Sequence, residues 1–491
     1  MRERLLAVVW ALLLLLLPVT SMPLVQKIVR SSTVASPSLL LLALMLVLWL
    51  LPYLLRRGHL PGAFWPLGAF TLAALISWAA SFFLATPSYK GVSVISEGAQ
   101  AFITLAIGLA YYLVSSTWVS SSDRLQATLR WINIAGLLII VWSAAQAAAW
   151  FSANRYPGWM RDFQDLLSLG PLYRQRVTGF ALEPSWLAHQ LNMLYLPVWL
   201  AATVRNTSAH NRRVLGITLE NALLLGGVAT MALTLSRVGF LAFLAMLAFL
   251  LLRLAIWLVR QMQGWLAARI RAPWLERPAG RAMITAAIVT LLLVVSLAAA
   301  FGGLYVFSKV DPRMANVYDL IFLRDSGFAI YANRLQFGER VVYWQAGWNI
   351  FEQYPLLGVG LGNAGFYFTD ALPPNAWQLS EVRRLMWHAG GLLNTKNLWA
   401  RLLSETGIAG FAFFISWLYL GFISAHSLLR RANPLQVTMG YVGIFVLLAL
   451  IFEGFSIDSF AMPYWWVSLG LVTAAFRLRP RPSEKANVLG E

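Results

Sequence analysis

Uninterrupted apolar stretches of about 20 residues are the feature that most constrains how this chain can fold. A bilayer core about 30 Å thick is crossed by about 20 apolar residues in helical form, so each such stretch is a candidate membrane span. Twelve are found, near residues 5–22, 36–55, 63–84, 98–119, 131–151, 184–204, 214–235, 237–259, 284–306, 407–427, 436–453 and 459–476. We therefore predict an all-α polytopic membrane protein with about twelve transmembrane helices.

The composition agrees with this prediction and excludes several chemistries. Of the 491 residues 59% are apolar and only 12% are charged, and the mean hydropathy is +0.66. The absence of cysteine excludes disulfides, thiolate metal sites and cysteine nucleophiles. The net charge of +18 is explained by contact with anionic lipid headgroups and by topology, so no nucleic-acid partner is expected.

The distribution of Lys and Arg predicts the orientation of the chain in the membrane, because positive residues near helix ends stay cytoplasmic. Both termini are then cytoplasmic, and the first run is retained as a helix. The predicted parts are helices 1–9 (residues 1–306) with an outer loop at 152–183 and an inner amphipathic loop at 260–283, a large outer segment between helices 9 and 10 (307–403), helices 10–12 (404–476) and a cytoplasmic tail (477–491). Trp265 and Trp274 indicate that the inner loop lies on anionic lipid.

A glycine-rich stretch, PLLGVGLGNAG at residues 355–365, follows a predicted amphipathic helix in the large outer segment. Its four glycines permit a tight turn and a close backbone approach to a ligand or a helix. No Lys-Ser/Thr pair follows it, and no parallel sheet is predicted around it, so it is not read as a nucleotide-binding phosphate loop.

Three arginines, Arg176, Arg237 and Arg340, are expected at one level near the outer membrane boundary. Taken singly, each is read as an anchor to lipid headgroups. Taken together, they supply the planar, permanently charged, bidentate donors that a pyrophosphate needs. A lipid-linked diphosphate is therefore the predicted ligand.

The other candidate side chains each have two interpretations. Glu183 begins the sixth span just before Pro184, where it either favours the helix start or acts as a general base. Glu453 lies beside the turn between the last two spans and either lines an outward cavity or is solvated. His388 is more typical of a surface residue than of a catalyst, and Lys396 and Asn397 precede the tenth span.

Four features together resemble the O-antigen ligase and O-antigen polymerase superfamily of GT-C type membrane glycosyltransferases. They are the twelve spans with one large outer segment, SRVG at the start of the eighth span, the segment Glu339–Asn363 that ends in PLLGVGLGN, and KNLWARLLSETGIAG at Lys396–Gly410. The resemblance implies transfer of a glycan from undecaprenyl pyrophosphate to a hydroxyl at the outer face, without nucleotide sugar, metal or other cofactor. It also implies that Arg176, Arg237 and Arg340 bind the pyrophosphate.

One position departs from the family pattern. Family ligases typically have His immediately before the equivalent of Asn397 as activator of the acceptor, whereas this chain has Lys396. A Lys with its reference pKa of about 10.4 is protonated at neutral pH, so either burial lowers the pKa or another residue is the base. Lys396 would then bind phosphate oxygen and Glu183 would be the base. Lys396 and the Glu183–Pro184 pair favour a polymerase over a ligase.

The resulting hypothesis is an inverting glycosyltransferase of the bacterial inner membrane with its active site facing the periplasm or exterior. Its catalytic residues are Glu183 and Lys396, with Asn397, His388 and Glu453 as accessory residues. Its partners are the lipid-linked glycan, a glycan or lipid acceptor, the bilayer and a chain-length regulator. The alternative is a transporter or flippase of the same lipid, which Glu220 in the seventh span favours, and a peptidoglycan polymerase of similar architecture is a third reading.

Overall fold

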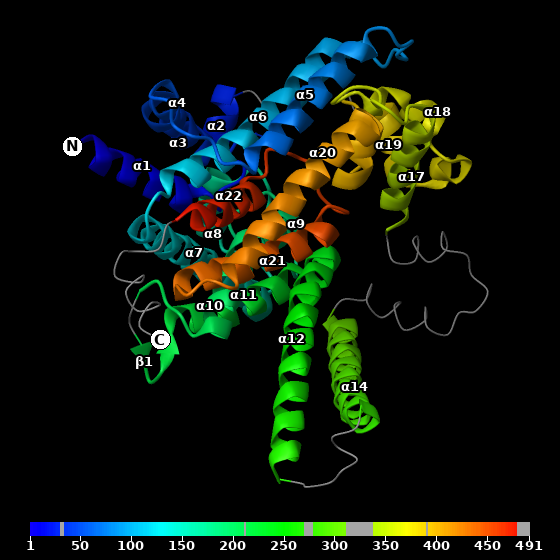
Figure 1. Ribbon diagram of the computed structural model, residues 1–491. Coiled ribbons are helices and arrows are strands. Elements are labelled where there is room, and N and C mark those ends of the chain that lie inside the picture. The colour runs from blue at the N-terminus through cyan, green and yellow to red at the C-terminus, as the bar shows by residue number, and fades with distance from the viewer. Residues whose placement is uncertain (30–33, 211–212, 270–277, 311–336, 389–390, 479–491) are drawn as a thin grey trace. The chain divides into compact units, whose positions relative to one another are not determined.

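The computed structural model describes residues 1–29, 34–210, 213–269, 278–310, 337–388 and 391–478 (Figure 1). In chain order its elements are α1 (Arg2–Leu16), α2 (Pro23–Val29), α3 (Ser38–Met45), η1 (Leu46–Leu50), α4 (Leu51–Leu55), α5 (Phe64–Ser81), α6 (Val94–Trp118), α7 (Ser122–Ala153), α8 (Gly158–Leu167), α9 (Pro184–Gln190), η2 (Leu191–Tyr195), α10 (Leu196–Arg205), β1 (Arg213–Val214), β2 (Ile217–Thr218), α11 (Leu219–Thr234), α12 (Arg237–Arg269), α14 (Pro278–Val310), α17 (Gly338–Gln353), η3 (Ala364–Tyr367), α18 (Phe368–Ala371), η4 (Pro374–Gln378), α19 (Ser380–His388), α20 (Leu398–Leu428), α21 (Pro434–Glu453) and α22 (Pro463–Arg477).

Helical structure overlaps every one of the twelve apolar runs, so the prediction of an all-α polytopic membrane protein is confirmed. Among the described residues, seven helices are long and apolar enough to cross a bilayer. The number twelve stays a prediction. The only strands among the described residues are β1 and β2, two residues each, which form an antiparallel hairpin between α10 and α11.

The chain divides into two compact units. The first comprises residues 1–242, 343–373 and 384–491, and the second comprises 243–342 and 374–383. In the second unit, Gln263 of α12 donates a hydrogen bond to Thr285 of α14 at 3.1 Å. Residues 260–269 continue α12 instead of starting a separate interfacial helix, since no proline interrupts them. Trp274, residues 311–336 of the large outer segment and residues 479–491 of the tail lie outside the described residues.

The core of the first unit lies where α5, α6, α20 and α22 meet. There α20 packs most extensively against α5, and α22 against α6 (Figure 1). Aromatic rings fill the centre: the rings of Trp465 and Trp466 stack at 4.0 Å between centroids, and that of Trp417 lies 5.1 Å from Trp466. Gly108 of α6 is needed beside them, because an added Cβ would come within 2.4 Å of the Trp466 ring.

The sixth predicted span is one continuous helical segment that contains a π-helical turn, η2, just before Pro197. Proline has no N–H to donate to the carbonyl of Met193, which would otherwise remain unsatisfied. The hydroxyl of Ser468 in α22 donates to this carbonyl at 2.6 Å. The proline therefore sets the wide turn, and a neighbouring helix satisfies the carbonyl that it releases.

Candidate functional site at one end of the first unit

Two of the three predicted arginines come together at the turn between α11 and α12. The guanidinium Nε of Arg176 donates to the carbonyl of Thr234 at 2.8 Å, and the backbone N–H of Val177 donates to Leu233 at 3.1 Å. Thr234 ends α11 and Arg237 begins α12 only three residues later. Both arginines are half-buried. These two hydrogen bonds place the loop segment that carries Arg176 close to the start of α12, where Arg237 lies.

A buried glutamine on α7 holds the segment that joins Arg176 to Glu183. The side-chain oxygen of Gln146 accepts from the backbone N–H groups of Thr178 and Gly179 at 3.0 and 3.1 Å. Its amide nitrogen donates to the Gly179 carbonyl at 3.0 Å. Because buried backbone groups must be hydrogen-bonded, the Gln146 side chain supplies the donor and acceptor that a neighbouring strand would supply in a sheet. The Gln146 side chain therefore fixes the middle of the segment that has Arg176 and Glu183 at its two ends.

Glu183 occupies the position before α9, but its carboxylate does not cap the helix backbone. It accepts instead from the hydroxyl of Ser185. Burial raises the pKa of Tyr173, the negative charge of Glu183 raises it further, and the positive charge of Arg176 opposes the shift. Glu183, Tyr173 and Arg176 therefore share one electrostatic environment, and the capping interpretation of Glu183 does not describe its side chain.

Glu453 lies buried behind this region at the end of α21. One carboxylate oxygen accepts from the Asn192 amide at 2.7 Å, and the other lies 3.5 Å from Nδ1 of His189. The same amide nitrogen of Asn192 donates to the carbonyl of Gly239 at 2.8 Å. Since Gly239 is two residues after Arg237, these contacts connect Glu453 to the SRVG motif. Glu453 is only 2% exposed, so the solvated interpretation is wrong.

The segment that carries Lys396 is attached to the same end. The N–H of Leu398 donates to the carbonyl of Gly454 at 2.7 Å, which places the start of α20 directly against the residue that follows Glu453. Lys396 is half-buried, has a left-handed backbone (φ 48°), and its ammonium lies 4.9 Å from the centre of the buried Tyr343 ring. A cation over an aromatic face is favoured while it is protonated.

The two accessory residues nearest to Lys396 differ in their surroundings. Asn397 is buried and caps α20, since its side-chain oxygen accepts from the N–H groups of Trp399 and Ala400 at 2.8 and 3.1 Å. This is the usual task of Asn at a helix start. His388, at the end of α19, is exposed, as expected for a surface residue.

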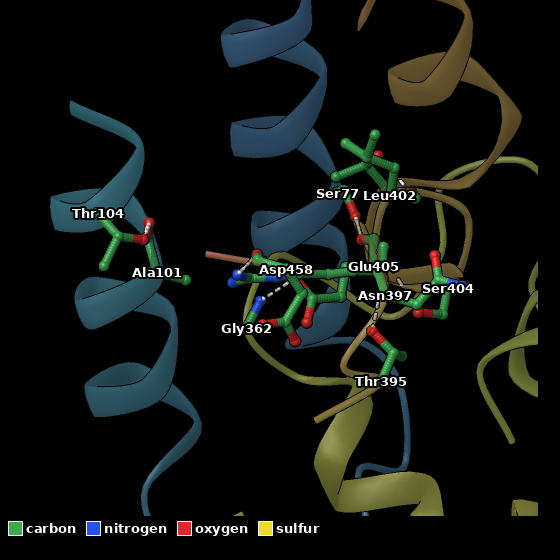
Figure 2. A network of polar contacts seen from close by, with 12 residues as sticks. Ser77, Ala101, Thr104, Gly362, Thr395, Asn397, Leu402, Ser404, Glu405 and Asp458 are labelled. Atoms are coloured by element: carbon green, nitrogen blue, oxygen red, sulfur yellow. Dashed lines mark hydrogen bonds and ion pairs between the residues drawn. The ribbon is translucent and has the colours of Figure 1, made fainter. Parts of the chain in front are cut away.

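The glycine-rich stretch and the SETG sequence of α20, which are 40 residues apart in the chain, form one compact structure (Figure 2). Gly362 donates its N–H to the Glu405 carboxylate at 2.9 Å, and Gly360 donates to the Glu405 backbone carbonyl at 3.0 Å. Ser77 of α5 also donates to that carbonyl, at 2.7 Å. The glycine-rich stretch therefore approaches a helix of the protein itself.

Positive backbone dihedrals make glycine necessary in this structure. Gly407 has φ 61° and ψ −168°, a conformation that interrupts α20, and an added Cβ would lie 2.3 Å from the Leu356 carbonyl oxygen. Gly358 has φ 68°, and its Cβ would lie 2.6 Å from the Ser404 carbonyl oxygen. Side chains are excluded from both positions because the two backbones touch.

Arg401 neutralises the buried Glu405. Its Nε lies 2.9 Å from a Glu405 oxygen, and its Nη1 donates to the carbonyl of Asp458 at 2.6 Å. The Arg and Glu side chains are 13% and 6% exposed. Glu405 is not among the residues predicted from the sequence, although the i, i+4 spacing of Arg401 and Glu405 is a signal for such a pair.

The third predicted arginine, Arg340, is the third residue of α17 and belongs to the second unit. The convergence of all three arginines stays a prediction. Among the described residues no three His, Asp or Glu side chains gather as metal ligands. Hydrogen bonds made by these residues or by their neighbours in the chain do place five other predicted residues at one end of the first unit: Arg176, Arg237, Glu453, Asn397 and Lys396.

Comparison with known families agrees with this arrangement. Residues 222–415 match the family model described as O-antigen ligase. The match covers less than half of the chain and includes SRVG, the glycine-rich stretch and the KNLWARLLSETG motif. It confirms the resemblance to the O-antigen ligase and polymerase superfamily. No curated protein matches the chain.

Proposed function

We propose that this member of the O-antigen ligase and polymerase superfamily is a membrane glycosyltransferase. It moves a glycan from a polyprenyl pyrophosphate carrier, such as undecaprenyl pyrophosphate, to an acceptor hydroxyl. The acceptor oxygen attacks the anomeric carbon as the bond from that carbon to the pyrophosphate oxygen breaks, so the configuration inverts. The hydroxyl proton passes to a base on the protein, and the pyrophosphate leaves on its lipid.

The observation that carries the proposal is the hydrogen bond that places Arg176 at the α11–α12 turn, beside Arg237 at the start of α12. Arg176 is held by the Thr234 carbonyl next to the start of α12, where Arg237 stands. Guanidinium groups that are positioned in advance offset the charge that develops on a leaving pyrophosphate without reorganisation. Arg340 is proposed as a third donor.

Glu183 is the proposed base and Lys396 the proposed phosphate donor. The Glu183 carboxylate accepts a hydroxyl hydrogen bond from Ser185 and interacts electrostatically with Tyr173, as expected of a proton acceptor in polar surroundings. The side-chain nitrogen of Lys396 lies 4.9 Å from the centre of the Tyr343 ring, a cation–π arrangement that suits a cationic donor. This division of roles favours a polymerase slightly over a ligase.

The proposed setting is the bacterial inner membrane, with both termini cytoplasmic and the arginine pair at the outer face. O-antigen or exopolysaccharide assembly is the proposed process, with a glycan or lipid acceptor and a chain-length regulator as partners. Several apolar helices and the family match support the membrane part of this proposal.

A lipid-linked glycan flippase is the second candidate. It is favoured by two ionisable residues that are buried within the helical bundle, His189 and Glu220, each of which is only 1% exposed. Such residues in a membrane are often part of a transport path. The π-helical turns η1 and η2 are the kind of helix irregularity that transport also uses.

Reconstitution of the full chain with a polyprenyl-diphosphate oligosaccharide tests the proposal. Release of lipid diphosphate and product length are followed by mass spectrometry and gel. Arg237→Ala is expected to lower the transfer rate by about 100-fold, as for the loss of one donor to a developing charge. Arg174→Ala is the matched control, since Arg174 is an exposed arginine two residues from Arg176.

The products separate the candidates. A ladder of lengthening lipid-linked glycan supports a polymerase, and one intact glycan on a separate acceptor supports a ligase. Glycan that crosses the vesicle membrane without diphosphate release would replace the transferase with the flippase. Equal rates for Arg237→Ala and Arg174→Ala would contradict the arginine site.

A further inference from the structure

A cavity of about 320 Å³ lies at the other end of the first unit, where no predicted catalytic residue is found. It is formed by the starts of α7, α11 and α21 and by the segment after α10. Its walls include apolar side chains of Leu129, Val198 and Val442, and its polar lining includes Thr438 and Ser208. The predicted topology places this end at the cytoplasmic side of the bilayer.

A buried carboxylate lines this cavity. Glu220, the second residue of α11, is 1% exposed. One oxygen, Oε1, accepts from the Asn133 amide at 2.8 Å and from the backbone N–H of Ala209 at 2.9 Å. The other oxygen, Oε2, is buried and has no hydrogen-bond partner among the residues that the structure describes.

The charge of Glu220 is not neutralised by any side chain in the described ranges. The nearby cation on α7, Arg130, directs its Nε to the Ala209 carbonyl at 2.6 Å and is exposed. The Asn133 side chain is itself held by the indole N–H of Trp199 at 3.0 Å, so it cannot turn away from Glu220 without loss of a buried bond. A buried carboxylate with one unpaired oxygen is costly unless a donor approaches it.

We propose that this cavity binds a small primary ammonium ion, which donates N–H to Oε2 of Glu220. Such a ligand supplies both the positive charge and the hydrogen-bond donor that this oxygen lacks, and charge-assisted hydrogen bonds of this type are strong. The apolar walls accept the carbon chain next to the nitrogen, while Thr438 and Ser208 accept the remaining N–H groups. A quaternary ammonium has no N–H and is excluded by the same reasoning.

The ammonium has two sources with the same chemistry: the headgroup of phosphatidylethanolamine, or a free amine. Arg130, Arg205 and Arg213 are exposed at this end, where they would meet the phosphate of a lipid. The proposal is independent of the glycosyltransferase reaction, because Glu220 is not among the residues assigned to it.

The test is thermal unfolding and native mass spectrometry of the purified full chain. The added probes are ethanolammonium, choline, phosphatidylethanolamine or phosphatidylcholine. We expect ethanolammonium or its lipid to bind at least about tenfold more tightly than the choline counterpart. A ratio of this size corresponds to the free energy of one hydrogen bond to a charged group. Binding of the lipid alone identifies the headgroup as the source, and binding of both identifies the ammonium itself.

Two variants make the assignment specific. Glu220→Gln should weaken ammonium binding at least about tenfold, while Asp123→Asn, which changes an exposed acid at the same end, should not. Ala202→Leu fills the cavity without altering the carboxylate, and should also abolish binding. Equal binding of ethanolammonium and choline probes, or undiminished binding in both Glu220→Gln and Ala202→Leu, would overturn the proposal.

Discussion

Two buried glutamates of the first unit, Glu405 in α20 and Glu220 in α11, are satisfied in different ways. A carboxylate oxygen of Glu405 receives both the Arg401 guanidinium and the Gly362 N–H. Within the described part of the chain, Glu220 receives two neutral donors on one oxygen and none on the other. The Glu405 carboxylate is thus neutralised within the protein and holds the glycine-rich stretch against α20. The Glu220 carboxylate keeps binding capacity, which is what a ligand site requires.

The largest expected effect comes from breaking the Arg401–Glu405 pair. Arg401→Met leaves a buried carboxylate without its counter-charge and should cost about 3–5 kcal/mol in unfolding free energy. The double variant Arg401→Met with Glu405→Gln removes both charges, and the amide oxygen still accepts from Gly362. Thermal unfolding should show that the double variant recovers most of the loss. If it is no more stable than the single variant, the pair is not what holds the glycine-rich stretch.

A smaller effect is expected at the break in α20. Gly407→Ala places a Cβ where the backbone has φ 61° and where the Leu356 carbonyl is 2.3 Å away. The expected cost is about 1–3 kcal/mol. Gly421→Ala is the control in the same helix, since its added Cβ meets only Leu469 at 3.9 Å. Similar unfolding temperatures for the two variants would mean that the contact between the two motifs adapts easily.

The cap of α20 should matter less. Asn397→Ala removes an acceptor from two backbone N–H groups and should cost about 1 kcal/mol. Asn397→Asp keeps the oxygen and should retain most of the stability. Transfer activity measured beside stability distinguishes a further role: a loss of activity in Asn397→Asp without a loss of stability would place Asn397 in the reaction.

The smallest effect on stability is expected at Glu220. Glu220→Gln keeps an oxygen for Asn133 and Ala209 and breaks no ion pair within the described residues, so its cost without added amine should be less than about 1 kcal/mol. Unfolding is measured in detergent beside Glu405→Gln, which should be far less stable. A comparable loss in the two variants would remove the distinction between the two carboxylates.

The residues of the candidate site differ in how well the amino-acid sequence predicts them. Arg176 and Arg237 were predicted from their positions next to apolar runs, and the structure brings their segments together. The approach of the glycine-rich stretch to a helix was one of two predicted outcomes. Gln146 and Asn192 were not predicted, because a polar residue inside an apolar run reveals no partner until the helices are packed.

The membrane class, the helical positions and the resemblance to the O-antigen ligase family could be predicted from the amino-acid sequence, because span length and local motifs are properties of contiguous residues. The i, i+4 spacing of Arg401 and Glu405 is visible along the chain, whereas the distant donors of the two buried glutamates follow from helix packing alone. The N–H of Gly362 donates to Glu405 over a separation of 43 residues, and the Asn133 amide donates to Glu220 over a separation of 87 residues. Hydrogen bonds over such separations depend on helix packing and not on spacing, which is why one glutamate serves the fold and the other faces a cavity.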